Sequence, residues 1–279
     1  MNDKKTVKDL YDIKNQTIII TGGGGLLGEQ YAEAIAEYGA TPVLWDINYE
    51  KVKKVAHNVS IKYNVDCLPF KVDVTEPKSI KAGLEKTLNN KKNINGLINN
   101  AAIDPKVEFE QDNSWSRFEY FDLNLWNRDL NVGLTGAFLC SKLIGGHMSL
   151  NGGGVIINIS SDLGIISPDQ RLYKKDGISD KDQFVKPVTY SVIKHGLIGL
   201  TKYLSTYWAN NLIRVNTLCP GGVYNNHPAE FVNKINKLIP MNRMAEVDEY
   251  KAAIIFLLSD ASSYMTGQNL VLDGGRTTW

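Results

Sequence analysis

The sequence predicts an α/β fold: a doubly wound parallel sheet of about seven strands with helices on both faces. Short, nearly all-apolar runs alternate with segments of helical period, which is typical of a parallel sheet covered on both sides. No linker, repeat or low-complexity stretch interrupts this alternation. A chain of 279 residues can form one such unit, so we expect a single domain spanning 1–279.

Local signals place the elements of the first half. A run of five β-branched residues predicts the first strand. The helix after it is expected to end at Gly39, because glycine suits a left-handed C-terminal cap. Asn48 can cap the next helix, which runs to about residue 63, and Pro77 fits the first turn of another. The strands expected in this half are 17–21, 41–46, 67–72 and 94–99.

The second half continues the alternation with longer interruptions. We expect helices over 123–148, 188–210 and 248–259, and strands over 155–160, 213–218 and 269–272. The segments 104–120 and 165–187 are polar, rich in helix breakers and too long for plain connections. We therefore expect both to be insertions that carry specificity, together with a substrate lid near 223–245.

Composition and charge argue against several classes of function. The formal net charge of +1 gives no electrostatic reason to expect nucleic acid or an anionic membrane as a partner. No apolar run reaches the ~18 to 20 residues that span a bilayer, and the polar segment 1–14 is unlike a secretory signal, so we expect a cytoplasmic protein. The cysteines show neither metal-ligand spacing nor a disulfide framework, and no metal is expected. They are Cys67, Cys140 and Cys219.

A glycine-rich loop, 21–28, lies between the first strand and the first long helix. Glycine permits positive φ and lets backbone N–H groups approach a pyrophosphate at a helix N-terminus. This context favours a dinucleotide cradle over a plain turn. The loop residues expected at the cofactor are Gly22, Gly25, Leu27 and Gly28.

Asp46 closes the second expected strand, about 20 residues after the loop. A carboxylate there can accept both hydroxyls of an adenosine ribose and would repel a 2′-phosphate. The next residues, Ile47, Asn48 and Tyr49, include no cation. We therefore predict NAD in preference to NADP, with a plain surface aspartate as the alternative.

Three further segments stand in register with this loop. They are Asn-Asn-Ala-Ala at 99–102, Tyr-x-x-x-Lys at 190–194 preceded by Ile-Ser-Ser at 159–161, and Pro-Gly-Gly-Val at 220–223. Together they make the chain resemble the short-chain dehydrogenase/reductase family from residue 17 to 275. The resemblance implies a Rossmann-like fold and hydride transfer between a nicotinamide and a secondary alcohol or ketone.

The Tyr-x-x-x-Lys spacing also makes chemical sense by itself. A phenol has an ordinary pKa of about 10, and an ammonium at i+4 on a helix lies about 5 to 6 Å away, where it favours phenolate. An exposed polar pair is the alternative. By the resemblance, Tyr190 exchanges a proton with the substrate and Lys194 holds the nicotinamide ribose. Ser161 positions the substrate oxygen, with Ser160 as the second choice.

The resemblance assigns further cofactor contacts near the ends of the strands. Residues that follow the second, third, fourth and sixth strands are expected at the adenine, the ribose or the nicotinamide. These are Ile47, Asp73, Val74, Asn100, Ala101, Ala102, Pro220, Gly221 and Val223, in addition to Tyr190 and Lys194.

The sequence departs from the family pattern at four places. One is Asn225, which stands where a threonine usually contacts the cofactor amide. Leu26 replaces the second glycine of the loop. Gly133 occupies the position of a usual catalytic asparagine, and Asn131 should face elsewhere, about 200° away around the helix. The segment between Ser161 and Tyr190 is longer than usual, and its lysines and arginine would suit a phosphorylated or acidic sugar. A solvated excursion is the alternative for that segment.

Other features resemble the subgroup of flagellin-modification oxidoreductases, which is associated with bacterial surface-sugar pathways. They are the Leu-Leu-Gly loop, Val-Gly-Leu-Thr-Gly-Ala-Phe, the inserted Ser-Pro-Asp-Gln and the ending Asp-Gly-Gly-Arg-Thr-Thr-Trp. The resemblance implies an NAD-dependent dehydrogenase that acts on a small sugar-derived substrate. It also implies that the protein forms a homodimer or homotetramer. Two alternatives stay open: a nucleotide-sugar epimerase or dehydratase that retains NAD, and a non-catalytic NAD-binding sensor.

Overall fold

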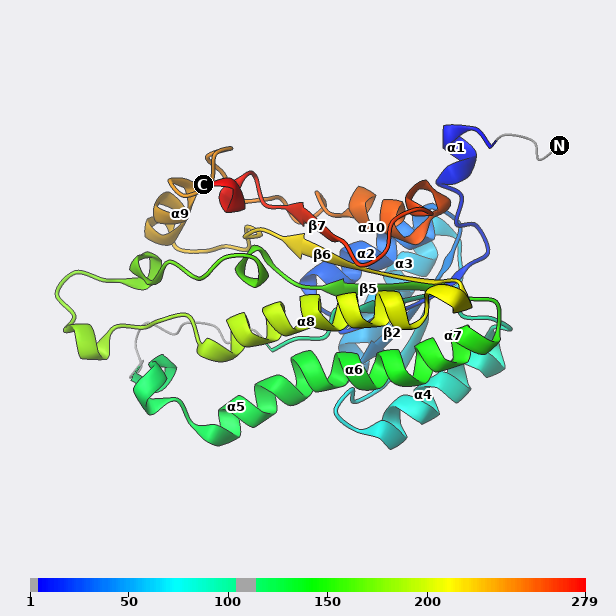
Figure 1. Ribbon diagram of the computed structural model, residues 1–279, viewed down its shortest axis with the longest axis horizontal. Helices are drawn as coiled ribbons and strands as arrows, with labels where there is room; N and C mark the ends of the chain where they lie inside the picture. The colour runs from blue at the N-terminus through cyan, green and yellow to red at the C-terminus, as the bar shows by residue number, and fades with distance from the viewer. Residues whose placement is uncertain (1–4, 104–113) are drawn as a thin grey trace.

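The computed structural model describes residues 5–103 and 114–279. Within these residues one sheet of parallel strands has the order β3-β2-β1-β4-β5-β6-β7 (Figure 1). The predicted doubly wound parallel sheet is therefore confirmed. The strand order reverses between β1 and β4, and the carboxyl ends of parallel strands leave a crevice at such a switch point. The strands are β1 (Thr17–Thr21), β2 (Thr41–Asp46), β3 (Leu68–Lys71), β4 (Gly96–Asn99), β5 (Gly154–Ile159), β6 (Ile213–Pro220) and β7 (Asn269–Leu272).

Successive side chains of a strand point to opposite faces of the sheet. Because the side chains on both faces are apolar, both faces are covered by helices. Ile18 and Ile20 belong to one apolar core and Ile19 to the other. Both cores lie against apolar helix faces, which explains why the strands show no polar alternation. The first core includes residues of α2 (Leu26–Glu37), α3 (Tyr49–Tyr63) and α10 (Lys251–Leu258), and the second includes residues of α4 (Pro77–Asn90), α6 (Gly136–Cys140), α7 (Gly146–Leu150) and α8 (Val188–Tyr207).

The helix-end signals read from the sequence are present. Gly39 follows α2 with a φ of +72°. The side chain of Asn48 accepts a hydrogen bond from the backbone N–H of Lys51 at 3.0 Å and so caps α3. Pro77 is the first residue of α4. These local predictions are confirmed.

The single long helix predicted over 123–148 is more irregular than expected. It consists of α5 (Leu123–Leu130), α6 and α7, joined by π-helical turns at Asn131–Thr135 and Ser141–Gly145. A π turn adds one residue to a helical turn and shifts the phase of the side chains after it. The short helices α1 (Val7–Leu10) and α9 (Ala229–Asn236) were not among the predicted elements.

The segment 165–187 packs against α9 through aromatic rings. The ring centroids of Tyr173 and Phe231 lie 5.9 Å apart, and those of Tyr173 and Phe184 lie 5.4 Å apart. Figure 1 shows this segment, α9 and the C-terminus at the same end of the molecule. The other expected insertion, 104–120, lies outside the described residues as far as 113. In the part of the chain that the structure describes, no helix is long and apolar enough to cross a membrane.

Candidate active site

A cleft of about 620 Å³ opens where β1, β4, β5 and β6 end. Each of these strands contributes a lining residue at or just after its carboxyl end. They are Gly22, Asn100, Ser161 and Pro220. Phe231 of α9 lines it as well. The cleft therefore lies at the switch point, where the fold places ligands.

The glycine loop is packed so closely that side chains would not fit. Gly22 has a φ of +63°, and a Cβ there would lie 2.9 Å from Ala101 Cα. A Cβ on Gly28 would collide with the carbonyl oxygen of Gly22. Gly25 is the N-cap of α2, so the first backbone N–H groups of that helix have no acceptor one turn earlier. A negatively charged pyrophosphate fits this cradle in charge and in donors.

Asp46 at the end of β2 is fixed by two backbone donors. Its Oδ2 accepts the N–H of Gly24 at 3.0 Å, and its Oδ1 accepts the N–H of Asn48 at 2.9 Å. A carboxylate oxygen can accept more than one hydrogen bond, so both oxygens retain acceptor capacity toward ribose hydroxyls.

A cation stands near Asp46 that adjacency in the sequence did not reveal. Lys51 lines the cleft together with Asp46, and a Cβ on Gly24 would lie 3.2 Å from Asp46 Oδ2 and 3.4 Å from Lys51 Cγ. Lys51 lies five positions after Asp46, in the first turn of α3, which begins beside the end of β2. The side of the cleft expected to hold the adenosine ribose thus carries both signs of charge.

Asn100 and its neighbour hold the glycine loop against β4. The side-chain amide of Asn100 donates to the carbonyl oxygens of Thr21 and Gly22, each at 3.1 Å. The hydroxyl of Thr21 accepts the N–H groups of Asn100 and Ala101 at 3.0 and 3.1 Å. The asparagine signature therefore fixes the shape of the cradle.

Tyr190 and Lys194 lie one turn apart on α8 and both line the cleft. Lys194 is 6% exposed, and its Nζ donates to the carbonyl oxygen of Ile159 at 2.8 Å. This Nζ lies 5.6 Å from the centroid of the Tyr190 ring. Lys186, from the segment 165–187, lies with its Nζ 3.9 Å from the same centroid. Two cations therefore flank one phenol.

The two serines after β5 have different partners. The Ser160 hydroxyl donates to the carbonyl oxygen of Lys194 at 2.7 Å, which ties β5 to α8. The Ser161 hydroxyl donates to Asp162 Oδ1 at 2.6 Å and accepts the N–H of Leu163 at 3.2 Å. Both serines line the cleft. The Ser160 hydroxyl joins two elements of the fold, whereas that of Ser161 bonds only within its own loop, so Ser161 is the better candidate to meet a substrate oxygen.

Gly133 has no room for the asparagine that the family resemblance implies. A Cβ on Gly133 would lie 2.7 Å from Ile193 Cγ2, on the neighbouring α8. Asn131 is exposed and does not line the cleft. No asparagine from this part of the long helix reaches Tyr190 and Lys194.

The cleft brings together most of the predicted residues but not all. Gly28 and Ala101 lie beneath the loop, and Ile47 is 63% exposed and lines a separate shallow hollow beside β3. Asp73 accepts from the hydroxyl of Thr75 at 2.7 Å, and Val74 packs in the second core. These residues support the cradle or stand apart from it. The predicted residues that line the cleft are Gly22, Gly25, Leu27, Asp46, Asn100, Ala102, Ser161, Tyr190, Lys194, Pro220, Gly221 and Val223.

Known proteins resemble the chain over nearly its whole length. A family model described as short chain dehydrogenase matches residues 16–173, and one described as Enoyl-(Acyl carrier protein) reductase matches residues 178–277. The chain is 26% identical to the post-translational flagellin modification protein A of Campylobacter coli, over 94% of this chain and 98% of that protein. It is 29% identical to the NAD-dependent glycerol dehydrogenase of Listeria innocua, over 96% of each.

A solved structure shows the same similarity in three dimensions. The gluconate 5-dehydrogenase from Burkholderia cenocepacia, in complex with NADP and tartrate, is similar with a TM-score of 0.81 at 28% identity. The similarity covers 97% of this chain and 98% of that one.

Proposed function

The chain belongs to the short-chain dehydrogenase family, and on that premise we propose that the cleft oxidises a secondary alcohol or reduces a ketone with a nicotinamide dinucleotide. One observation carries this proposal. Tyr190, Lys194 and Ser161 meet in the same cleft as the glycine loop, although Ser161 is far from the loop in sequence. A dinucleotide lying on the loop and a substrate oxygen at the phenol then share one space.

The chain's own residues would handle the proton. A nicotinamide bound in the cleft takes up or supplies the hydride. The Tyr190 hydroxyl takes the proton from a substrate alcohol or returns it to a carbonyl. The ammonium of Lys194, held by Ile159, stabilises the negative charge that the phenol gains. Ser161 orients the substrate oxygen toward Tyr190.

For the cofactor we propose NAD in preference to NADP. The carboxylate of Asp46 is held at the edge of the cleft by two N–H donors and would repel a 2′-phosphate. Lys51 acts in the opposite direction, and the relatives include one protein named for NAD and one solved with NADP. Asp46 would accept the ribose hydroxyls directly, and for this reason we assign it the larger effect.

For the substrate we propose a small polyol or sugar derivative with an acidic or phosphorylated group. Lys186 brings a positive charge to the cleft, and Tyr173 and Phe231 add aromatic side chains to its lining. The relatives are named for glycerol, for gluconate and for flagellin modification. We place this activity in surface polysaccharide or flagellin glycan synthesis in the cytoplasm. We propose that the protein forms a homodimer or homotetramer and that residues 223–245 form a lid over the substrate.

The experiment is a substrate screen with the purified protein. Glycerol, mannitol, gluconate and phosphogluconate are each mixed with NAD or NADP, and the nicotinamide absorbance is followed. We expect net NADH formation, faster with the acidic substrates and with NAD. Tightly retained NAD with interconversion of a nucleotide sugar and no net redox change would support the epimerase or dehydratase instead. Cofactor binding without turnover of either kind would support the sensor.

A further inference from the structure

The hydroxyl of Ser161 is oriented by a carboxylate. A hydroxyl has one proton to donate and two lone pairs. Ser161 gives its proton to Asp162 Oδ1 at 2.6 Å, and Leu163 donates its N–H to the serine oxygen at 3.2 Å. The N–H of Leu163 also reaches Asp162 Oδ1 at 2.8 Å. These contacts fix the position of the serine oxygen. To hold a substrate oxygen, the hydroxyl turns its proton from Asp162 Oδ1 to that oxygen and keeps the Leu163 N–H as its own donor.

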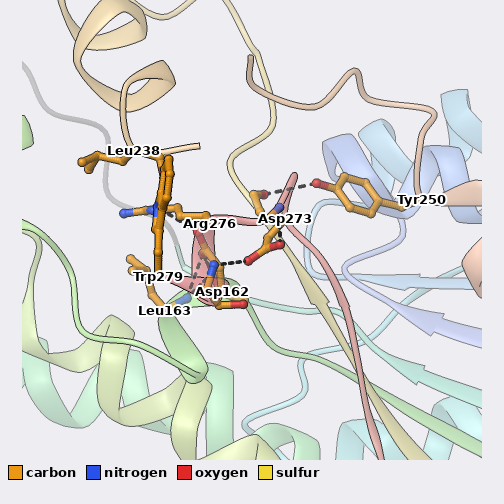
Figure 2. A network of polar contacts seen from close by, with 11 residues as sticks. Asp162, Leu163, Leu238, Tyr250, Asp273, Arg276 and Trp279 are labelled. Atoms are coloured by element: carbon orange, nitrogen blue, oxygen red, sulfur yellow. Dashed lines mark hydrogen bonds and ion pairs between the residues drawn. The ribbon is translucent and has the colours of Figure 1, made fainter. Parts of the chain in front are cut away.

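The carboxylate of Asp162 is in turn held by an arginine from the far end of the chain. Arg276 donates from Nη1 to Asp162 Oδ2 at 2.7 Å (Figure 2). The two residues are 6% and 3% exposed. Both line the cleft. The pair is therefore a buried ion pair in direct contact with Ser161.

The backbone around Arg276 is tightly constrained. Gly274 and Gly275 turn the chain after β7 with φ values of +65° and +90°. The carboxylate of Asp273 accepts the N–H of Gly275 at 2.9 Å and that of Thr277 at 2.7 Å. The guanidinium is thus presented from a fixed turn.

The same turn contacts the segment that follows α9. Met241 donates its N–H to the carbonyl oxygen of Gly274 at 3.1 Å. The indole N–H of Trp279 donates to the carbonyl oxygen of Leu238 at 3.2 Å (Figure 2). The C-terminal segment 273–279 therefore connects the region of α9 to the loop that carries Ser161.

A contribution to stability does not by itself explain why Asp162 and Arg276 are buried as an ion pair. Burying two charges costs desolvation energy, and apolar residues in their place are often as stable. Next to Tyr190, however, the pair has a use. An unpaired carboxylate at 162 would orient Ser161 but would oppose negative charge on the phenol of Tyr190 in the same cleft. Arg276 balances that charge while it holds the carboxylate in place.

We propose that Asp162 and Arg276 are positioning residues for Ser161, and that the C-terminal segment 273–279 is thereby part of the active site. The inference rests on the proposed function, since it assigns Ser161 to the substrate oxygen. It predicts that Arg276→Ala lowers kcat on the order of 10- to 100-fold, as small misplacements of reacting groups do. The Kd for NADH, measured by fluorescence, stays within about two-fold, because the cofactor cradle is not touched.

A double variant separates positioning from mere stability. Arg276→Ala leaves the charge of Asp162 buried and unpaired, so its Tm will fall. Asp162→Ala with Arg276→Ala removes both charges, and we expect Tm to recover toward that of the wild type while kcat stays low. If kcat recovers together with Tm, the pair is only structural and the proposal is overturned. Lys91→Ala, which breaks an ion pair with the exposed Asp66 and does not line the cleft, is the matched control and leaves kcat unchanged.

A cycle with Ser161→Ala tests the route of the effect. If the pair acts through Ser161, the triple variant Ser161→Ala/Asp162→Ala/Arg276→Ala, in which no unpaired charge is left near Tyr190, turns over at the same rate as Ser161→Ala alone. Losses that multiply would contradict the proposal. The substrate in these assays is whichever of glycerol, mannitol, gluconate and phosphogluconate the wild type oxidises fastest.

A measurement without substrate keeps the inference distinct from the proposed function. If the wild type oxidises none of the four compounds, the proposed function fails, and hydrogen exchange decides the fate of the pair. We expect the peptide 160–166, which contains the Leu163 amide, to exchange faster in Arg276→Ala than in the wild type or in Lys91→Ala. Equal exchange in all three proteins would show that Arg276 does not hold this loop.

Discussion

Gly133 lies so close to α8 that one added methyl group should destabilise the protein. In Gly133→Ala the new Cβ would lie 2.7 Å from Ile193 Cγ2 and 3.1 Å from its Cδ1, well inside the 3.5 to 4.0 Å at which carbon atoms attract. Overpacking of this kind costs about 1 to 3 kcal/mol. Replacing glycine in a helix otherwise stabilises by about 1 kcal/mol. The net expectation is a loss of up to about 2 kcal/mol.

The sign of the effect should reverse once Ile193 is truncated. In an Ile193→Ala background the clashing atoms are gone, and Gly133→Ala should stabilise by up to about 1 kcal/mol, the helix-propensity difference. The assay is urea unfolding followed by circular dichroism at one fixed protein concentration, since oligomers unfold in a concentration-dependent way. Equal destabilisation in both backgrounds would refute the account of why this helix carries no asparagine here.

Three further outcomes follow from the site. Asp46→Ala should weaken NAD binding on the order of 10-fold, whereas Lys51→Ala should weaken NADP binding more than NAD binding. Isothermal titration calorimetry with both cofactors measures the two affinities. If the ratio of the NAD affinity to the NADP affinity is unchanged in Lys51→Ala, Lys51 has no part in the choice of cofactor. Lys186→Ala should raise the KM for gluconate more than that for glycerol, and Lys181→Ala, in the same segment, is the control; parallel changes for both substrates would contradict a role in charge recognition. Burial raises the pKa of two of the three thiols to about 12 and that of the third to about 11, so Ellman's reagent at about pH 8 should label none in the native protein and all in denaturant; rapid native labelling would contradict their burial. The thiols belong to Cys67, Cys140 and Cys219.

The sheet could be predicted closely because its signals are local. The strand over 17–21 is β-branched throughout, and β1 has the same bounds in the structure. Gly39, Asn48 and Pro77 mark helix ends through their own backbone and side-chain chemistry. In the long helix, by contrast, π turns depend on packing against neighbouring helices, and apolar period alone does not reveal them.

The motifs of the site could be predicted from the sequence, but the contacts between residues that are distant in the sequence could not. Tyr190 and Lys194 are separated by one helical turn, so their proximity follows from the sequence. Asp162 and Arg276 are 114 positions apart, and only the fold brings β5 and the chain after β7 together. Lys51 is not adjacent to Asp46 in the sequence, and it reaches the cleft only because α3 begins beside the end of β2.

The central claim is that the Tyr190 hydroxyl moves the substrate proton in this cleft, and Tyr190→Phe tests it most directly because the ring stays and only the hydroxyl is lost. Tyr203→Phe, an exposed tyrosine on the same helix, is the control. With Tyr190→Phe the account predicts NADH affinity within about two-fold of the wild type and turnover lower on the order of 10²- to 10⁴-fold. Turnover equal to that of Tyr203→Phe would contradict it.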